Sequence, residues 1–298
     1  MKVFYKNELI FKLIYFLLIG LTGLVLSIQS SDILIMAGSM LVILIYVMLA
    51  LKREVIRYRA VMRDFPPEWR EIIAAYSRFY NSIDAAGKKR FERDVSIFLS
   101  GHTIRGIRGE ETTVRTMLLV AAGVATILHG REEWEPPFSD GVVVYPGETF
   151  DPEYNLFKGQ IAGMAGERRP LLVTEEILEQ SFRDPEDGYN SLIHEIAHYF
   201  DFENPQISGV PLIGGDTDRT EEWIATMETE RERVNRGESF LRPYAGANEA
   251  EFFAVATEFF FERPEEMTAR NPDLYELLKN FYNLDTNRIL HRDNDSRH

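Results

Sequence analysis

Residues 194–198 read His-Glu-Ile-Ala-His, a pattern with the chemistry of a metal site. On a helix, side chains at positions i and i+4 lie one above the other on the same face, so His194 and His198 can bind one ion. Glu195 then lies beside that ion, where its carboxylate can accept a proton from water. Two histidines and a glutamate at this spacing are typical of zinc hydrolases, chiefly peptidases.

The sequence around the motif predicts the helix that the motif needs. Asn190 or Ser191 can cap its N-terminus, after a turn at residues 184–188. Apolar residues recur at helical spacing around the histidines, namely Leu192, Ile193, Ile196, Ala197 and Phe200. The alternative is a core helix whose histidines only form hydrogen bonds. The pair of histidines with Glu195 favours the metal site over that alternative.

A catalytic zinc site needs a third protein ligand beside an open position for water. Asp201 shares the helix face of the first histidine, but seven residues span about 10 Å of helix, which favours a supporting role. Glu251 is the better candidate, because it lies in a strongly apolar helical segment, residues 248–261, where a buried carboxylate needs a cation. Glu249 and Glu258 compete with it, and Glu258 is also a candidate for a supporting side chain.

Tyr244 lies in the segment Arg-Pro-Tyr-Ala-Gly, residues 242–246, just before that apolar helix. Its phenol can donate a hydrogen bond to the negatively charged oxygen that forms when water attacks a carbonyl group. A loop tyrosine can equally pack on the surface, and its position alone favours that simpler interpretation.

Three segments together resemble the Mlc titration factor A family of zinc-dependent peptidases. They are His-Glu-Ile-Ala-His-Tyr-Phe-Asp (194–201), Ser-Gly-Val-Pro (208–211) and the stretch from Tyr244 through Asn-Glu-Ala-Glu-Phe-Phe-Ala-Val to Phe261. The similarity runs over about residues 65–290. The last segment also resembles the protease domain of anthrax lethal factor.

This resemblance implies roles for particular residues. The Glu of the Glu-Phe-Phe segment is the third zinc ligand in those proteins and the upstream Tyr is catalytic, which implies these roles for Glu251 and Tyr244. It also implies a zincin-like domain and a peptide or protein substrate. Members of the family bind and sequester a transcriptional repressor, so the alternative function is a membrane-tethered regulatory protein with secondary peptidase activity.

Composition limits the other classes of function. The chain has 298 residues, 45% of them hydrophobic, and no cysteine, which leaves histidines and carboxylates as metal ligands. Residues 1–63 hold eight basic and three acidic side chains, whereas the remainder holds 25 basic and 44 acidic ones. An acidic domain is a poor candidate for direct binding to nucleic acid.

Residues 1–51 predict a hairpin of two membrane-spanning helices. Residues 9–28 and 33–51 are apolar runs of about spanning length, joined by the short polar segment 29–32. A cleaved signal peptide is the alternative for the first run, but no small-x-small cleavage site follows it. The bilayer contact is therefore assigned to residues 9–51.

The distribution of basic residues predicts the orientation of the hairpin. Lysines precede the first run and a group of lysines and arginines follows the second, whereas the connecting loop has no positive charge. The positive-inside rule places both ends in the cytoplasm. We therefore expect a protein of the inner (cytoplasmic) membrane that crosses it twice and has a cytoplasmic catalytic domain.

The rest of the chain predicts an α+β domain that is mostly helical and has a small sheet. Residues 52–64 form a basic stalk, residues 65–290 the zinc peptidase domain, and residues 291–298 a polar tail. Helices are expected over 68–99 and, as a buried helix, over 112–128, and strands over 141–145, 161–166 and 170–174. One of the last two strands can pair with an extended substrate.

Overall fold

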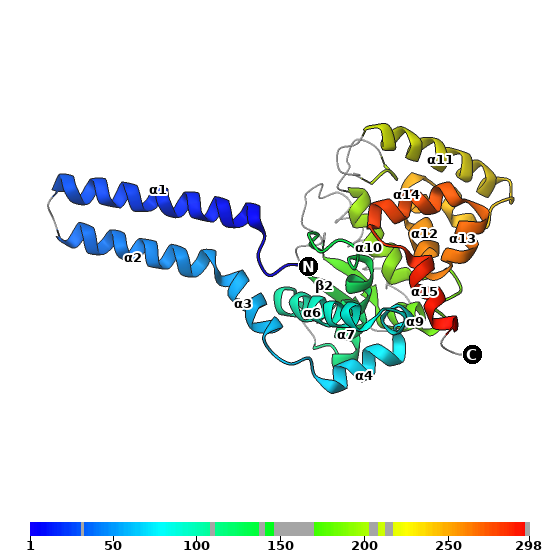
Figure 1. Ribbon diagram of the computed structural model, residues 1–298, viewed down its shortest axis with the longest axis horizontal. Coiled ribbons are helices and arrows are strands. Elements are labelled where there is room, and N and C mark those ends of the chain that lie inside the picture. Colours follow the sequence, from blue (N-terminus) through cyan, green and yellow to red (C-terminus); the bar gives the residue numbers. More distant parts are fainter. Residues whose placement is uncertain are drawn as a thin grey trace. The chain divides into compact units, whose positions relative to one another are not determined.

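The computed structural model describes residues 1–30, 33–107, 111–136, 141–145, 170–202, 208–211 and 217–295. The chain divides into two compact units, residues 1–64 and 65–298. Figure 1 shows their helices and strands.

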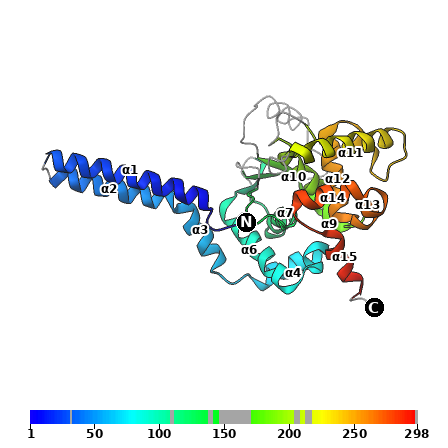
Figure 2. The same cartoon turned by 45° about the horizontal axis from the view of Figure 1, so that its top comes forward.

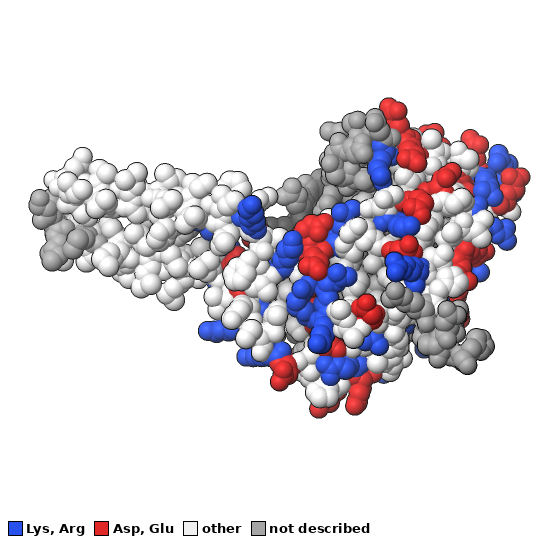
Figure 3. Space-filling view, in the orientation of Figure 1, with Lys and Arg blue, Asp and Glu red and all other residues white. Residues whose placement is uncertain are grey.

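The first unit consists of three helices, α1 (Lys6–Ser30), α2 (Ile33–Ala50) and α3 (Lys52–Val61). Helices α1 and α2 pack side by side (Figure 2). Among the described residues only α1 is both long and apolar enough to cross a membrane. The apolar segment given for α2, Ala37–Ala50, is shorter. Figure 3 shows almost no charged side chain along this helical pair.

Charged side chains of the first unit meet at one end of the helical pair. Arg53 Nη2 lies 2.6 Å from Glu8 Oε2, and Lys12 forms an ion pair with Glu54. The Tyr46 hydroxyl donates to the backbone oxygen of Lys12 at 3.0 Å. These contacts join the start of α1 to α2 and α3, at the end opposite the short connection between α1 and α2.

The second unit is mostly helical and has a small sheet, as the sequence predicts. Its α-helices are α4 (Pro67–Tyr76), α5 (Arg78–Ser82), α6 (Ala85–Gly101), α7 (Val114–Ile127), α9 (Glu175–Arg183), α10 (Ser191–Phe202), α11 (Thr217–Asn235), α12 (Glu249–Glu262), α13 (Pro264–Arg270), α14 (Pro272–Tyr282) and α15 (Thr286–Asp295). A short 3-10 helix, η2, spans Pro243–Gly246. The strands are β1 (Ile104–Gly106), β2 (Val142–Tyr145) and β3 (Leu171–Thr174).

The three strands form one parallel sheet in the order β1-β2-β3. Val142 pairs with Ile104 on one side and with Leu171 on the other. Strands β2 and β3 agree with the sequence prediction, and the predicted strand over 161–166 lies outside the described residues. Sequence reasoning missed β1, because three residues are too short to show a strand pattern.

The core of the second unit brings α7, α10 and α12 together. Helix α7 is the predicted apolar helix, and its side chains from Leu118 to Ile127 are buried. A Cβ atom on Gly123 would lie 2.2 Å from Leu192 Cδ2, so only glycine lets α7 approach α10 this closely. On the other side, α10 packs against the apolar helix α12. The His-Glu-Ile-Ala-His motif of α10 therefore faces a helix held firmly by packing.

Candidate metal centre

The start of α10 is fixed by Asn190, the first of the two predicted caps. Its Oδ1 accepts a hydrogen bond from the backbone N–H of Ile193 at 3.0 Å. Its Nδ2 donates to the backbone oxygen of Ser181 at 2.9 Å and to Glu262 Oε1 at 3.0 Å. The capping residue thus joins α10 to both α9 and α12 and fixes where the histidines lie.

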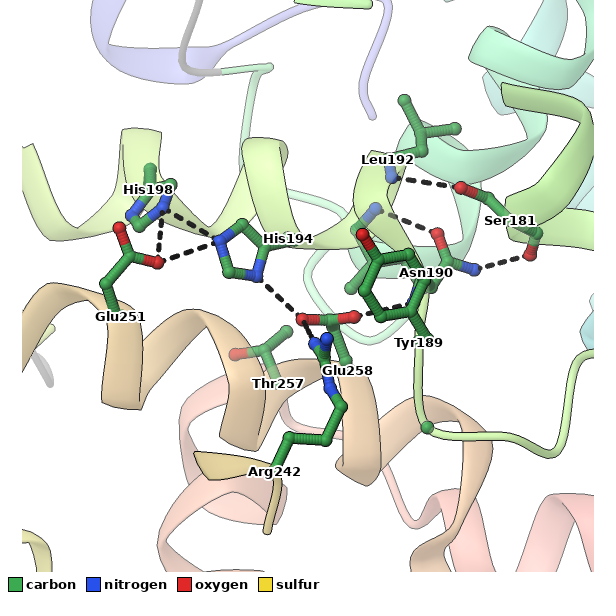
Figure 4. A network of polar contacts seen from close by, with 12 residues as sticks. Ser181, Tyr189, Asn190, Leu192, His194, His198, Arg242, Glu251, Thr257 and Glu258 are labelled. Carbon is green, nitrogen blue, oxygen red and sulfur yellow. Dashed lines mark hydrogen bonds and ion pairs between the residues drawn. The ribbon is translucent and has the colours of Figure 1, made fainter. Parts of the chain in front are cut away.

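His194, His198 and Glu251 meet at one point between α10 and α12 (Figure 4). Glu251 Oε2 lies 3.0 Å from His194 Nε2 and 3.5 Å from His198 Nε2. The two Nε2 atoms lie 3.1 Å apart. Within the part of the chain that the structure describes, this is the one group of three or more such side chains close enough to hold an ion.

The spacing of these three atoms fits a zinc ion. Zinc binds histidine nitrogen and carboxylate oxygen at about 2.0–2.2 Å in a tetrahedral arrangement, which puts neighbouring ligand atoms about 3.3 Å apart. The observed separations of 3.0, 3.1 and 3.5 Å bracket that value. Two imidazoles and one carboxylate also form a donor set found in catalytic zinc sites that keep a position open for water.

Glu251 lies in the first turn of α12, where Asn248 caps the helix and accepts from the backbone N–H of Glu251 at 2.9 Å. Its two competitors lie elsewhere. Glu249 forms an ion pair with Arg231, and Glu258 lies two turns further along α12. Of the three carboxylates, only Glu251 reaches the Nε2 atoms of both histidines.

Glu258 holds His194 from the opposite side of its ring (Figure 4). This carboxylate is fully buried, and its Oε1 lies 2.6 Å from His194 Nδ1 and also accepts from Arg242. Its Oε2 accepts from the backbone N–H of Asn190 at 2.6 Å. A carboxylate that accepts the Nδ1 hydrogen leaves Nε2 for the metal, which is the usual way that proteins orient a histidine ligand.

The electrostatics of the cluster reflect these contacts. Burial lowers the pKa of His194, but hydrogen bonds to Glu251 and Glu258 outweigh burial and raise it to about 9. Burial raises the pKa of Glu251, whereas its hydrogen bonds to His194 and His198 lower it by more. The metal-free cluster therefore combines an ionised carboxylate with a protonated imidazole, so binding of a cation displaces a proton.

Glu195 and Tyr244 line a cleft of about 230 Å³ next to the cluster. The Tyr244 side chain is half exposed, and the centre of its ring lies 6.0 Å from that of His194. Burial raises the pKa of the phenol, and the charge of Glu251 adds to this effect. Tyr244 therefore keeps its proton at neutral pH and can donate a hydrogen bond.

Comparison with known proteins shows which family the chain belongs to. The sequence model of the glucose-regulated metallopeptidase M90 family matches residues 52–283. The chain belongs to this family. Mlc titration factor A of Escherichia coli O9:H4 is 30% identical over 178 residues, which cover 55% of this chain and 66% of that relative. The resemblance to the Mlc titration factor A family is thereby confirmed.

A further relative extends the similarity over more of the chain. An uncharacterised protein of Synechocystis sp. is 25% identical over 240 residues, which cover 75% of this chain and 86% of that protein. The chain spans just under two thirds of the E. coli relative's length. Membership of the M90 family implies a metallopeptidase-like protein with a metal, for which the three-ligand cluster is the site that the geometry offers.

Asp201, the supporting candidate on α10, holds a turn rather than a histidine in the hydrogen bonds seen here. Its Oδ1 accepts from the backbone N–H of Gly209, and Ser208 Oγ lies 3.5 Å from its Oδ2. Gly209 has a φ of +73° and its backbone oxygen accepts from Trp223 Nε1 at 2.6 Å. In this M90 protein Asp201 therefore anchors the Ser-Gly-Val-Pro segment to the motif helix.

Sequence reasoning missed two ionisable side chains that support the centre. Arg242 pairs with Glu258, and Glu262 accepts from Asn190 and, at 3.1 Å, from the backbone N–H of Gly188. Burial raises the pKa of Glu262 to about 8, and the nearby charges of Asp187 and Glu258 add to the shift. The sequence carries no spacing signal for either residue, because their partners come from other segments.

Proposed function

We propose that this M90 protein is a zinc-dependent peptidase, anchored to a membrane by its N-terminal helices. The observation that carries the proposal is the meeting of His194, His198 and Glu251 at distances that suit zinc, beside a cleft that contains Glu195. When bound, zinc supplies a Lewis acid that makes a water more acidic and polarises a carbonyl group.

The side chains of the cleft then have distinct tasks. Glu195 is the general base that takes a proton from the attacking water and passes it to the leaving amine. Tyr244 donates a hydrogen bond to the oxygen of the carbonyl group as negative charge develops there. Glu258 keeps His194 in the tautomer that presents Nε2.

The sheet offers a place for the substrate backbone. Leu172 and Val173 of β3 line the cleft, and β2 pairs with β3 on one side. Among the described strands β3 lies at the edge of the sheet, so an extended peptide can add to its other side by main-chain hydrogen bonds, which would bring it past the ligand cluster. Such strand pairing would favour cleavage of a peptide bond inside an extended segment of polypeptide.

For the first unit we propose a hairpin that crosses the membrane twice, with both ends in the cytoplasm. Helix α1 is long enough to span, and the apolar side chains along α1 and α2 are largely exposed, as lipid contact requires. The ion pairs of Glu8 with Arg53 and of Lys12 with Glu54 gather charge at one end of the pair. That end then lies at the cytoplasmic surface, where basic residues are favoured.

The topology predicts the behaviour of reporter fusions. A reporter joined after His298 should be active only in the form that works in the cytoplasm, and one inserted at residues 30–32 only in the form that works outside. The protein should also stay in the membrane fraction after alkaline extraction. Activity of the external reporter at His298 would show that residues 1–51 cross the membrane once or are removed.

A second function is favoured by the name of the E. coli relatives, Mlc titration factor A, which says that they titrate Mlc. By analogy, this chain can act as a membrane-tethered protein that sequesters a transcriptional regulator. The acidic composition of residues 64–298 disfavours direct contact with DNA in that role. Undiminished capture of a regulator by a zinc-free His194→Ala variant would favour sequestration over hydrolysis.

Removal of the metal tests the enzymatic proposal. The purified full chain should contain about one zinc per molecule and cleave members of a peptide library, and a chelator should abolish cleavage. Adding back one equivalent of zinc should restore it, because the ligand cluster keeps its geometry through the contacts of Glu258. Full cleavage by the chelated protein, shown metal-free by elemental analysis, would contradict the proposal.

A further inference from the structure

The mouth of the cleft carries two exposed tyrosines. Tyr189 is 45% exposed and Tyr244 is 53% exposed, and both line the cleft. Across the described residues of the 65–298 unit, no other Phe, Tyr or Trp side chain is exposed to this extent. Tyr244 has a proposed catalytic task, whereas nothing in the chemistry of hydrolysis requires Tyr189. Exposed aromatic surface at a cleft is a mark of ligand contact.

Tyr189 is held in place by an unusually well-anchored backbone. Three consecutive N–H groups each donate to a side-chain carboxyl oxygen: Gly188 to Glu262 at 3.1 Å, Tyr189 to Asp187 at 2.7 Å and Asn190 to Glu258 at 2.6 Å. Gly188 has a φ of +75°, and a Cβ atom there would lie 2.9 Å from the Phe259 ring. The backbone that carries the exposed ring is therefore preorganised, so binding of a ligand to the ring costs little entropy for ordering this segment.

The charges around Tyr189 disfavour an acidic ligand, and the rest of the wall favours an apolar one. The Arg242 guanidinium stacks on its ring, with Cζ 4.3 Å from the ring centre, but the buried carboxylate of Glu258 already pairs with this cation. Glu195 adds a negative charge to the cleft, which repels an acidic side chain. The remaining wall includes the apolar side chains of Leu172, Val173 and Ile177.

We propose that this part of the cleft is a specificity subsite that takes one large apolar side chain, an aromatic one above all, next to the peptide bond that is cleaved. The inference rests on the proposed peptidase function. A cleft of about 230 Å³ is smaller than the roughly 300–1,000 Å³ of sites that hold a whole small molecule, so it suits a single side chain. The aromatic side chain packs against the Tyr189 ring.

The test uses the full chain in detergent and quenched fluorescent peptides that differ only in the residue on either side of the cleaved bond. At one of these positions, kcat/KM should be about tenfold higher for Phe than for Ala. The value for Asp should be lower than that for Ala. Tyr189→Ala should reduce the Phe-to-Ala ratio to about one, and Tyr189→Phe should keep it. Val114→Ala is the matched control, because Val114 is 47% exposed but does not line the cleft.

Two results separate this proposal from the peptidase proposal. If the wild type cleaves peptides without preference, or if Tyr189→Ala keeps the Phe preference, the subsite is overturned and the peptidase stands. If no peptide is cleaved, binding of the same peptides to Glu195→Gln protein is measured by fluorescence anisotropy. Tighter binding of the Phe peptide, lost when Tyr189→Ala is added, would support the subsite alone. Equal binding, or none, would overturn the subsite as well.

Discussion

Replacing Glu195 by Gln should lower kcat/KM for peptide hydrolysis by about a thousandfold and leave the zinc content at about one ion per chain. An amide cannot accept the proton of the attacking water, and loss of a general base costs roughly 10²–10⁴ in rate. Zinc should remain, because His194, His198 and Glu251 form the ligand cluster and Glu195 is outside it. Steady-state kinetics and elemental analysis on the same preparations measure both effects.

Two further variants serve as controls for this result, one that should lose zinc and one that should change nothing. His194→Ala should lose both zinc and hydrolysis, because it removes one of three ligands and the partner of Glu258. Glu232→Gln should keep both zinc and hydrolysis, because this side chain on α11 is 74% exposed. Among the described residues its one ion pair is with Arg236, at 3.7 Å. Hydrolysis by Glu195→Gln within tenfold of the wild type would refute the assigned role of Glu195.

The contrast between the histidine motif of α10 and the distant ligand Glu251 shows what local sequence can predict. The spacing of the histidines and the cap at Asn190 are properties of one helix, so the i, i+4 rule predicts α10 without knowledge of the fold. Glu251 is 57 positions from His194, and only the cost of burying a carboxylate, together with the family resemblance, singled it out from Glu249 and Glu258. The structure separates these three by their contacts with other segments.

The sequence names Glu258 as a supporting candidate and Asn190 as a cap, but the partners that these side chains meet could not be predicted, for a physical reason. The supporting residues come from three separate segments: Arg242 precedes η2, Glu258 lies in α12 and Asn190 precedes α10. Their hydrogen bonds exist only because these segments pack together. Strand β1 is similar, since its three residues are ordered by pairing with β2 and carry no pattern of their own. Long amphipathic helices are encoded locally, whereas such contacts are encoded by the fold.

Helix α7 shows that the same apolar signal can have two outcomes. Its residues are about as apolar as those of α1, yet α7 is buried in the 65–298 unit and α1 exposes most of its side chains. Length distinguishes them, because 14 residues of helix span about 21 Å and 25 residues about 38 Å, against about 30 Å of hydrocarbon. The sequence prediction of a buried helix over 112–128 rests on the same kind of argument, the shortness of its 17 residues, together with the threonines and the arginine at its start.

Replacing Glu258 by Gln should weaken zinc binding by 10- to 100-fold and lower the free energy of unfolding by about 2–4 kcal/mol. The fully buried carboxylate accepts from His194 and Arg242 through Oε1 and from the Asn190 N–H through Oε2. Whichever way the amide turns, its NH₂ group faces one of these donors, and the Arg242 cation loses its counter-charge. Removing such an outer partner of a histidine ligand typically costs 10–100-fold in metal affinity.

Competition with a chelator of known affinity measures the zinc Kd, and urea unfolding of the zinc-free protein measures the change in stability without the metal's own contribution. Glu232→Gln again serves as the control and should change the free energy of unfolding by less than about 0.5 kcal/mol. A zinc Kd for Glu258→Gln within threefold of the wild type would mean that packing of α10 against α12 alone orients His194. In that case the assignment of Glu258 as the residue that sets the tautomer would be wrong, even if stability falls as expected.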